Sequence, residues 1–146
     1  DGEVVDLYAG VGLFGVCLAA RGASVVAVEG DRASAADLKV NAAPYVARIR
    51  AHSAPVEEYL RRPPDRPGAT VVVDPPRTGM SRDSVSGLLR RGAPRVVYVS
   101  CDLATLARDV RSFIDRGYAL DHLEALDLFP NTAHVETLAV LVRNAG

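Results

Sequence analysis

Short runs rich in β-branched residues alternate with longer segments of helical period along this chain, and no other feature limits its fold as strongly. Such alternation is typical of βαβ units, which form a parallel sheet with helices on both faces. The strand-like runs cover residues 3–8, 24–29, 46–52, 69–74, 95–100, 119–129 and 135–143, and helical segments cover 13–21, 32–43, 54–62, 81–91 and 103–116. No helical segment separates the last two runs, so we expect them to form an antiparallel hairpin. The prediction is an α/β, Rossmann-like fold with a mostly parallel sheet of about seven strands and an antiparallel last strand.

Length and composition place further limits on the chain. Its 146 residues, 49% of them hydrophobic, suit one domain over residues 1–146. No apolar run approaches the ~20 residues that span a bilayer, so we expect no membrane partner. The two cysteines lie far apart and no Cys/His spacing resembles a metal site, which favours the cytoplasm and no bound metal. The net charge of -1 argues against binding nucleic acid by bulk charge.

The chain begins with Asp and not Met, and it enters a strand-like run almost at once. We therefore expect a domain taken from a longer protein, with further parts upstream.

A glycine loop follows the first expected strand. Gly10, Gly12 and Gly15 form G-x-G-x-x-G, and Glu29 ends the second expected strand. Glycines let the backbone approach a ligand, and an acid at that offset can accept hydrogen bonds from ribose hydroxyls, so we expect a nucleotide-containing ligand. Asp6, four residues before Gly10, makes the loop similar to the S-adenosylmethionine loop of class I methyltransferases. A dehydrogenase that binds NAD is one alternative, and a turn that merely needs glycine is another.

The fourth expected strand ends in Asp74-Pro75-Pro76-Arg77. Ligands bind outside the carboxyl ends of strands in sheets of this kind, and paired prolines form a rigid rim that can hold a planar base. The alternative is a rigid loop in which Asp74 only caps a turn. Amino-group methyltransferases acting on bases have a similar stretch followed by an aromatic residue. Arg77 occupies that place here, which indicates a different chemistry.

Cys101 lies where the fifth expected strand ends and a helix begins. A thiolate at a helix N-terminus is stabilised by the helix dipole, and Ser100 or Asp102 could cap this helix. Arg77 could add positive charge. The alternative is a small apolar residue that fills space at the strand end. That simpler interpretation is the one we assign to Cys17, which we place on the apolar side of the first helix.

His134 and Glu136 open the last expected strand, and both point to one face because strand residues two apart do so. Glu136 is either a solvated carboxylate or a functional base. A structural hydrogen bond is the favoured role for His134.

Five stretches together, DLYAGVG, VEGD, DPPRTG, VSCDLATLARD and DLFPNTAHVETLAVL, resemble in this order the catalytic domain of the RNA uridine-5-methyltransferases. The resemblance runs from Asp6 to near Val142. It implies S-adenosylmethionine as methyl donor, a uridine of tRNA or rRNA as substrate, Cys101 as nucleophile and Glu136 as base. It also implies cofactor contacts at Tyr8, Gly10, Gly12, Leu13, Glu29 and Asp74.

The sequence departs from the family pattern at three places. Asp102-Leu103 replaces a common Asn-Pro, and a carboxylate there would oppose thiolate formation if it pointed at Cys101. Leu13 replaces a commoner Asn and can supply only backbone contacts. The segment HSAPVEE, at 52–58, is hard to align with the family's adenine-contacting stretch.

Two other functions stay open at this point. One is methylation of another base position without covalent attack, and the other is a non-catalytic module that binds cofactor or RNA. In each case we expect a monomer with RNA as its partner.

Overall fold

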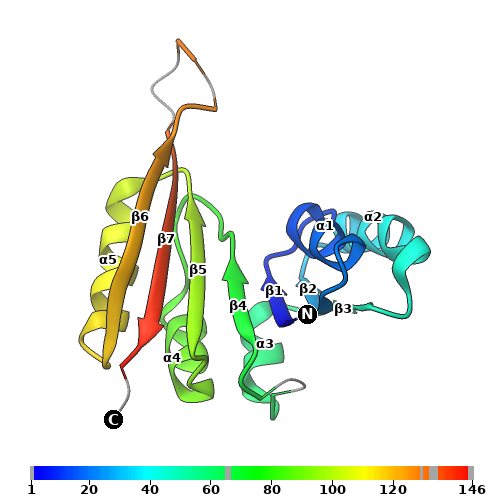
Figure 1. Cartoon of the computed structure of the whole chain (residues 1–146), viewed down its shortest axis with the longest axis horizontal. Helices are drawn as coiled ribbons and strands as arrows, with labels where there is room; N and C mark the ends of the chain where they lie inside the picture. Colours follow the sequence, from blue (N-terminus) through cyan, green and yellow to red (C-terminus); the bar gives the residue numbers. More distant parts are fainter. Residues whose placement is uncertain (1, 65–66, 129, 132–134, 145–146) are drawn as a thin grey trace.

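The centre of this protein is a sheet whose strands lie side by side in the order β3-β2-β1-β4-β5-β7-β6 (Figure 1). The computed structural model describes residues 2–64, 67–128, 130–131 and 135–144. Within these residues the strands are β1 (Glu3–Leu7), β2 (Ser24–Glu29), β3 (Ile49–Ser53), β4 (Thr70–Val73), β5 (Arg95–Ser100), β6 (Tyr118–Leu126) and β7 (Glu136–Arg143). The helices are α1 (Leu13–Ala20), α2 (Arg32–Ala42), α3 (Val56–Arg61), α4 (Arg82–Arg91) and α5 (Leu103–Ile114), with a short 3-10 turn, η1, at Ala43–Tyr45.

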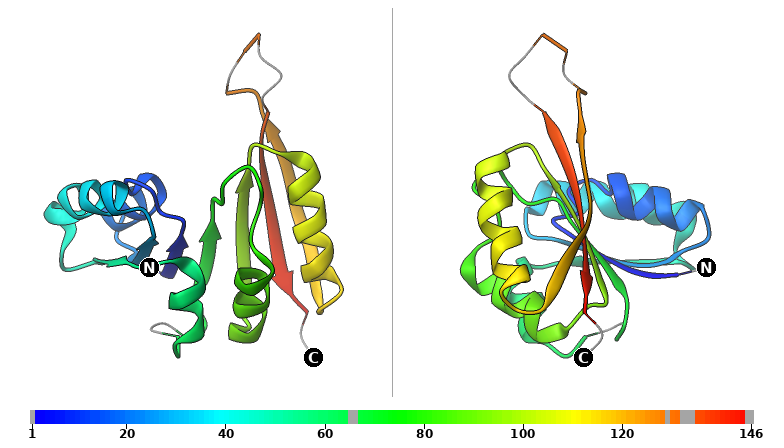
Figure 2. Two further views of the ribbon diagram at one scale, coloured as in Figure 1. Left: turned by 180° about the vertical axis from the view of Figure 1, so that it is seen from behind. Right: turned by 60° about the vertical axis from the view of Figure 1, so that its left-hand side comes forward.

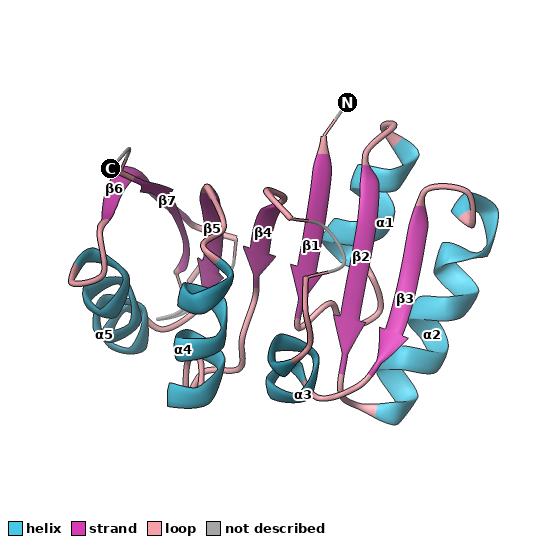
Figure 3. Cartoon of the chain, turned by 90° about the horizontal axis from the view of Figure 1, so that it is seen from below, coloured by secondary structure: helices cyan, strands magenta, loops and turns pink. Residues whose placement is uncertain are grey.

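Helices cover both faces of the sheet, as predicted. α1 and α2 lie on one face, and α3, α4 and α5 lie on the other (Figures 2 and 3). Each face has its own core of buried residues: Leu38 and Ala42 of α2 lie in one, and Leu88 and Phe113 lie in the other. The central strands contribute to both cores, which is why β2 carries a continuous apolar run.

The strand β7 is antiparallel to both of its neighbours. It pairs with β5 from Arg95↔Val142 to Ser100↔Thr137, and with β6 along the hairpin. In Figure 1 the arrows of β4, β5 and β6 point one way and the arrow of β7 points the other. The predicted fold class and antiparallel last strand are therefore confirmed.

Small differences from the predicted bounds have local causes. The third strand begins at Ile49 and not at residue 46, because η1, with Pro44 in its first turn, is followed by a turn over residues 46–48. Helix α3 begins at Val56, after Pro55, and β6 ends at Leu126. No helix among the described residues is long and apolar enough to cross a membrane.

The placement of Cys17 was wrong. Helix α1 buries Gly15 and Ala19, whereas Cys17 is exposed. Residue 17 lies two positions from each of these, which is more than half a turn around a helix, so its side chain points away from the sheet.

The register of β7 predicts which of its leucines supports the core. Leu141 is fully buried and Leu138 is half-buried. We expect Leu141→Ala to lower the free energy of unfolding by about 2–5 kcal/mol, the usual cost of truncating a core leucine. Leu138→Ala is the matched control and should cost less. Chemical denaturation measures both, and a larger loss for Leu138→Ala would contradict the register, since a slip by one residue exchanges the two faces.

Candidate functional site

The predicted site residues lie on five strands or their adjoining loops, at one edge of the sheet. The loop after β1 carries Gly10, β2 ends at Glu29, and Asp74 and Cys101 directly follow β4 and β5. Glu136 opens β7, and because β7 runs antiparallel, its first residue lies at the same edge. The fold thus collects residues that are far apart in the sequence.

Two positions of the glycine loop require glycine, and the second position does so for two reasons. Gly10 has φ 54° and Gly12 has φ 99°, values in the left-handed region that favour glycine. A Cβ on Gly12 would also lie 2.7 Å from Val16 Cγ2 and 2.8 Å from Leu38 Cδ1. The backbone at Gly12 therefore packs directly against side chains of α1 and α2, whereas a Cβ on Gly10 would meet nothing within 4 Å.

Glu29 organises this loop. Its Oε2 accepts a hydrogen bond from the Gly10 N–H at 2.7 Å, and its Oε1 accepts one from the Asp31 N–H at 2.7 Å. A carboxylate has about four acceptor positions. Each Glu29 oxygen can therefore accept a further bond from a ligand hydroxyl while the loop stays fixed.

Asp6 lies beneath the loop and is fully buried. Its Oδ2 accepts a hydrogen bond from the Gly15 N–H at 2.8 Å, and its Oδ1 has no partner among the described residues. The pKa of Asp6 is raised to about 7, mainly by burial and to a smaller extent by repulsion from Asp74 and Glu29, while the Gly15 bond lowers it. A Cβ on Gly15 would lie 2.8 Å from this carboxylate, so the third glycine of the motif serves the contact between α1 and Asp6.

Tyr8 and Leu13 take different positions beside the loop. Tyr8 has φ 62°, and its hydroxyl donates to Ser84 Oγ of α4 at 3.0 Å, so its side chain packs on the α3–α5 face. A contact from Tyr8 to a ligand in the loop would therefore use its backbone. Leu13 is 66% exposed at the start of α1.

Asp74 lies close enough to Glu136 for the two charges to interact. Asp74 is half-buried, and burial, followed by repulsion from Glu136, raises its pKa. The carboxylate that follows β4 and the carboxylate that opens β7 thus share one part of the edge.

Cys101 and Glu136 approach each other through the β5–β7 ladder. The last pair of that ladder is Ser100↔Thr137, and the same register continued by one residue places Cys101 opposite Glu136. Directly opposite residues of antiparallel strands have Cα atoms about 4.5–5.5 Å apart and side chains on the same face. Cys101 is partly exposed. The ladder thus ends one residue before the predicted nucleophile and one residue after the predicted base, and its register points to adjacent positions for them.

Asp102 caps α5. Its Oδ1 accepts a hydrogen bond from the Thr105 N–H at 2.8 Å, and this bond, with a smaller effect of Arg77, lowers the pKa of Asp102. Ser100 supports the same turn, because its Oγ accepts from the Asp102 N–H at 3.1 Å. The carboxylate of Asp102 thus faces the first turn of its own helix. His134 lies outside the described residues.

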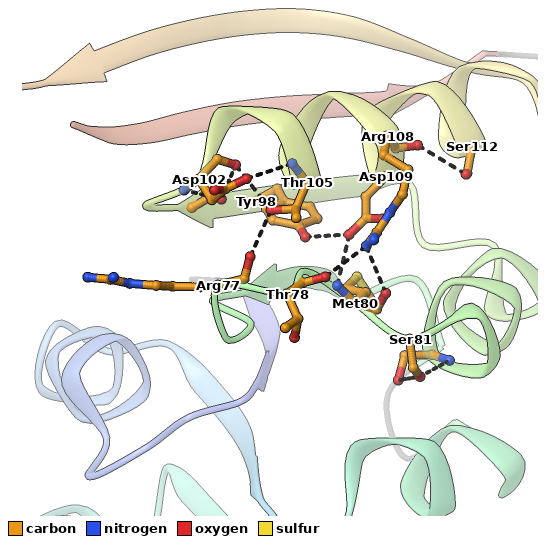
Figure 4. A network of polar contacts seen from close by, with 12 residues as sticks. Arg77, Thr78, Met80, Ser81, Tyr98, Asp102, Thr105, Arg108, Asp109 and Ser112 are labelled. Carbon is orange, nitrogen blue, oxygen red and sulfur yellow. Dashed lines mark hydrogen bonds and ion pairs between the residues drawn. The ribbon is translucent and has the colours of Figure 1, made fainter. Parts of the chain in front are cut away.

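Sequence reasoning missed Arg108 and Asp109 of α5. Asp109 is buried, and its carboxylate accepts hydrogen bonds from the segment after Asp74 and from Tyr98 (Figure 4). The available signal was the position of Asp109 on the buried stripe of α5, between Leu106 and Phe113. A carboxylate at a core position of a helix needs partners.

A cleft of about 890 Å³ opens between α4, α5 and the segment 76–81. Its walls include Tyr8, Glu57, Arg82 and Arg108. Neither Cys101 nor Glu136 lines it, so among the predicted site residues it involves Tyr8 and not the predicted nucleophile or base. Among the described residues no three His, Cys, Asp or Glu side chains form a group that could hold a metal ion.

Comparison with known proteins identifies similar sequences. The family model described as tRNA (uracil-5-)-methyltransferase matches residues 66–144. An uncharacterized RNA methyltransferase of Streptomyces coelicolor is 42% identical over 140 residues, which cover 94% of this chain and 30% of that protein. The 23S rRNA (uracil(1939)-C(5))-methyltransferase RlmD of Pseudomonas entomophila is 41% identical over 94% of this chain and 31% of its own length. The chain thus spans about a third of the curated relatives it matches.

A solved structure is also similar along nearly the whole chain. The Pyrococcus abyssi tRNA (uracil-54, C5)-methyltransferase, in complex with S-adenosyl-L-homocysteine, superimposes with a TM-score of 0.84. It is 36% identical, and the match covers 97% of this chain and 34% of that one.

The raised pKa of Asp6 predicts a pH dependence of stability. Between its unfolded value of 3.8 and its folded value of about 7, the folded protein holds a proton that the unfolded chain has lost. The contribution of Asp6 to the free energy of unfolding should therefore fall as pH rises through this window, by up to about 1.4 kcal/mol per pH unit. Asp6→Asn should remove this component, which denaturation at pH 4–8 measures as a change in slope.

Asp37, exposed on α2, supplies the control. Asp37→Asn changes the same atoms outside the core and should follow the wild type. Parallel curves for wild type and Asp6→Asn would contradict the prediction.

Proposed function

Because the chain belongs to the tRNA (uracil-5-)-methyltransferase family, we propose that the protein transfers a methyl group from S-adenosylmethionine to carbon 5 of a uridine in RNA. The observation that supports this proposal is the β5–β7 register, whose last pair is Ser100↔Thr137 and which, extended by one residue, would set a thiol and a carboxylate opposite each other. This pair fits the chemistry that carbon 5 of uracil requires. The related rRNA and tRNA enzymes support RNA as the substrate class.

The glycine loop and its carboxylates suit S-adenosylmethionine. The proposed cofactor contacts are Tyr8, Gly10, Gly12, Leu13, Glu29 and Asp74. A Cβ on Gly10 would meet nothing within 4 Å, so the loop is open there, and Glu29 has acceptor positions free for ribose hydroxyls while it holds the loop. When bound, the cofactor supplies an electrophilic methyl group on a positively charged sulfur.

Cys101 makes carbon 5 reactive. Carbon 5 of uracil is too weak a nucleophile to take the methyl group unaided. The Cys101 thiolate forms a bond to carbon 6, and the π electrons of the 5,6 double bond move into the carbonyl to give an enolate. Cys101 directly precedes Asp102, the N-cap of α5, so it lies beside the N-terminus of this helix. Carbon 5 of the enolate then bonds to the methyl carbon, and the bond between that carbon and the cofactor sulfur breaks, so that S-adenosylhomocysteine leaves.

Glu136 completes the reaction. Its carboxylate takes the proton from carbon 5, the electrons of that bond restore the 5,6 double bond, and the sulfur of Cys101 leaves as thiolate. A uridine in structured RNA must turn out of its stack to reach both groups. The rest of the RNA would be held by parts of the protein outside this chain, because bulk charge here is close to neutral.

The cofactor proposal predicts the effect of removing Glu29. Glu29→Ala should weaken binding of S-adenosylhomocysteine by about 1–3 kcal/mol, because the ribose hydroxyls and the Gly10 N–H lose their acceptor. Titration calorimetry on the complete protein measures this loss. Glu29→Gln keeps one oxygen acceptor and should lose less. Tighter binding of NAD than of S-adenosylhomocysteine would show instead that the dehydrogenase interpretation was right.

The catalytic proposal predicts that Cys101 and Glu136 variants fail at different steps. Cys101→Ala should abolish both methyl transfer and any covalent protein–RNA complex, because no bond to carbon 6 can form. Glu136→Gln should still add and methylate but should stall before elimination, and it should accumulate a complex that survives denaturant. Gel shift under denaturing conditions and nucleoside mass spectrometry of the RNA measure these two products.

Cys17→Ala is the matched control, because Cys17 is exposed on α1, and it should change neither product. An active Cys101→Ala enzyme would remove Cys101 from the reaction. If Glu136→Gln trapped no RNA, the base would be another group.

A further inference from the structure

We infer that Arg108 and Asp109 of α5 are positioning residues for the uridine site, because they hold the segment after Asp74 against the helix that begins beside Cys101. This inference rests on the proposed function. In this inference, α5 fixes the position of Asp74 relative to that of Cys101.

Asp109 joins three parts of the fold. Its Oδ2 accepts hydrogen bonds from the Met80 N–H at 2.8 Å and from the Tyr98 hydroxyl at 2.7 Å, and its Oδ1 accepts from Arg108 Nε at 2.8 Å. The residue is only 2% exposed, so its bonds from Met80 and Tyr98 are shielded from water, whereas the Arg108 side chain is 54% exposed. Burial and the bond to Asp109 raise the pKa of Tyr98, which keeps its hydroxyl a donor.

Arg108 holds the same segment through its carbonyl groups. Its Nη2 donates to the carbonyl oxygens of Thr78 at 3.1 Å and Met80 at 3.2 Å. One turn earlier on α5, Thr105 Oγ1 donates to the Arg77 carbonyl at 3.1 Å. Figure 4 shows these bonds along one side of α5. The helix therefore holds the segment at Arg77, Thr78 and Met80.

Gly79 shows how closely the segment approaches α5. Its φ of 73° favours glycine, and a Cβ there would lie 2.5 Å from Arg108 Nη2 and 2.7 Å from Asp109 Oδ2. No side chain fits in this space. The close contact is thus built into the backbone of the segment.

Asp74 has little conformational freedom, because the segment that follows it is held against α5. Pro75 and Pro76 separate Asp74 from Arg77, and each proline ring fixes its own φ. At the other end, Cys101 directly precedes the Asp102 cap of α5. Movement of α5 would therefore shift Cys101 and Asp74 together. If the contacts between α5 and the segment after Asp74 were lost, Cys101 and Asp74 could move apart.

The test compares two arginines of α5 in the complete protein. Arg108→Lys keeps the charge but loses the planar group that bonds to Asp109 and to two carbonyls at once. We expect kcat for methyl transfer to RNA to fall about 10- to 100-fold, because a displacement of about 1 Å has effects of this size. The Kd for S-adenosylhomocysteine and Tm should stay close to wild type, while hydrogen exchange in residues 76–81 should become faster.

Arg111→Lys is the matched control. Arg111 lies on the same helix and pairs with Asp115 at 2.9 Å on the surface. It should leave kcat and hydrogen exchange unchanged.

Two results would overturn the inference, and they can be told apart. Full kcat in Arg108→Lys, or a fall in kcat matched by equal losses of cofactor affinity and Tm, would overturn the positioning role alone. Absence of 5-methyluridine from RNA treated with the wild-type protein would overturn the proposed function and, with it, this inference.

Discussion

The hydrogen-bonded ladder between β5 and the antiparallel β7 is the interaction on which the rest of the site depends. All strands that neighbour each other in the parallel part of the sheet end at the same edge, whereas β7 begins there. A parallel β7 would carry Glu136 to the opposite edge, about 25 Å away for a strand of this length. The direction of one strand therefore decides whether the thiol of Cys101 has a carboxylate beside it.

Several carboxylates lie close together at this edge, and they repel one another. Repulsion from Glu29 and Asp74 adds to burial in raising the pKa of Asp6, and Glu136 raises that of Asp74. Backbone amides offset part of this repulsion, as at Gly10 and Gly15. A positively charged ligand, such as the sulfonium in the proposed function, would be stabilised by the charges that remain.

The sequence predicted the elements well because hydrophobic period and turn residues are local signals. It located the strand ends at Glu29, Asp74 and Cys101, and hence the edge where they meet. It did not predict the exposure of Cys17, because a short apolar helix such as α1 has no clear polar side. It also missed Asp109, because the partners of that carboxylate lie on a distant loop and on another strand, and only the packed structure brings them together.

The order of strands has a consequence for how this protein folds. The first three strands and their helices pair among themselves, and the last four strands do so as well, so most contacts lie within one half of the chain. The halves join where β1 pairs with β4, from Val4↔Thr70 onward, and such distant pairing forms slowly because a long loop must close first. The glycine loop and Glu29 belong to the first half, and Asp74, Cys101 and Glu136 belong to the second. The residues of the complete site therefore come together only when β1 and β4 have paired, so the site depends on the slowest kind of contact in the sheet.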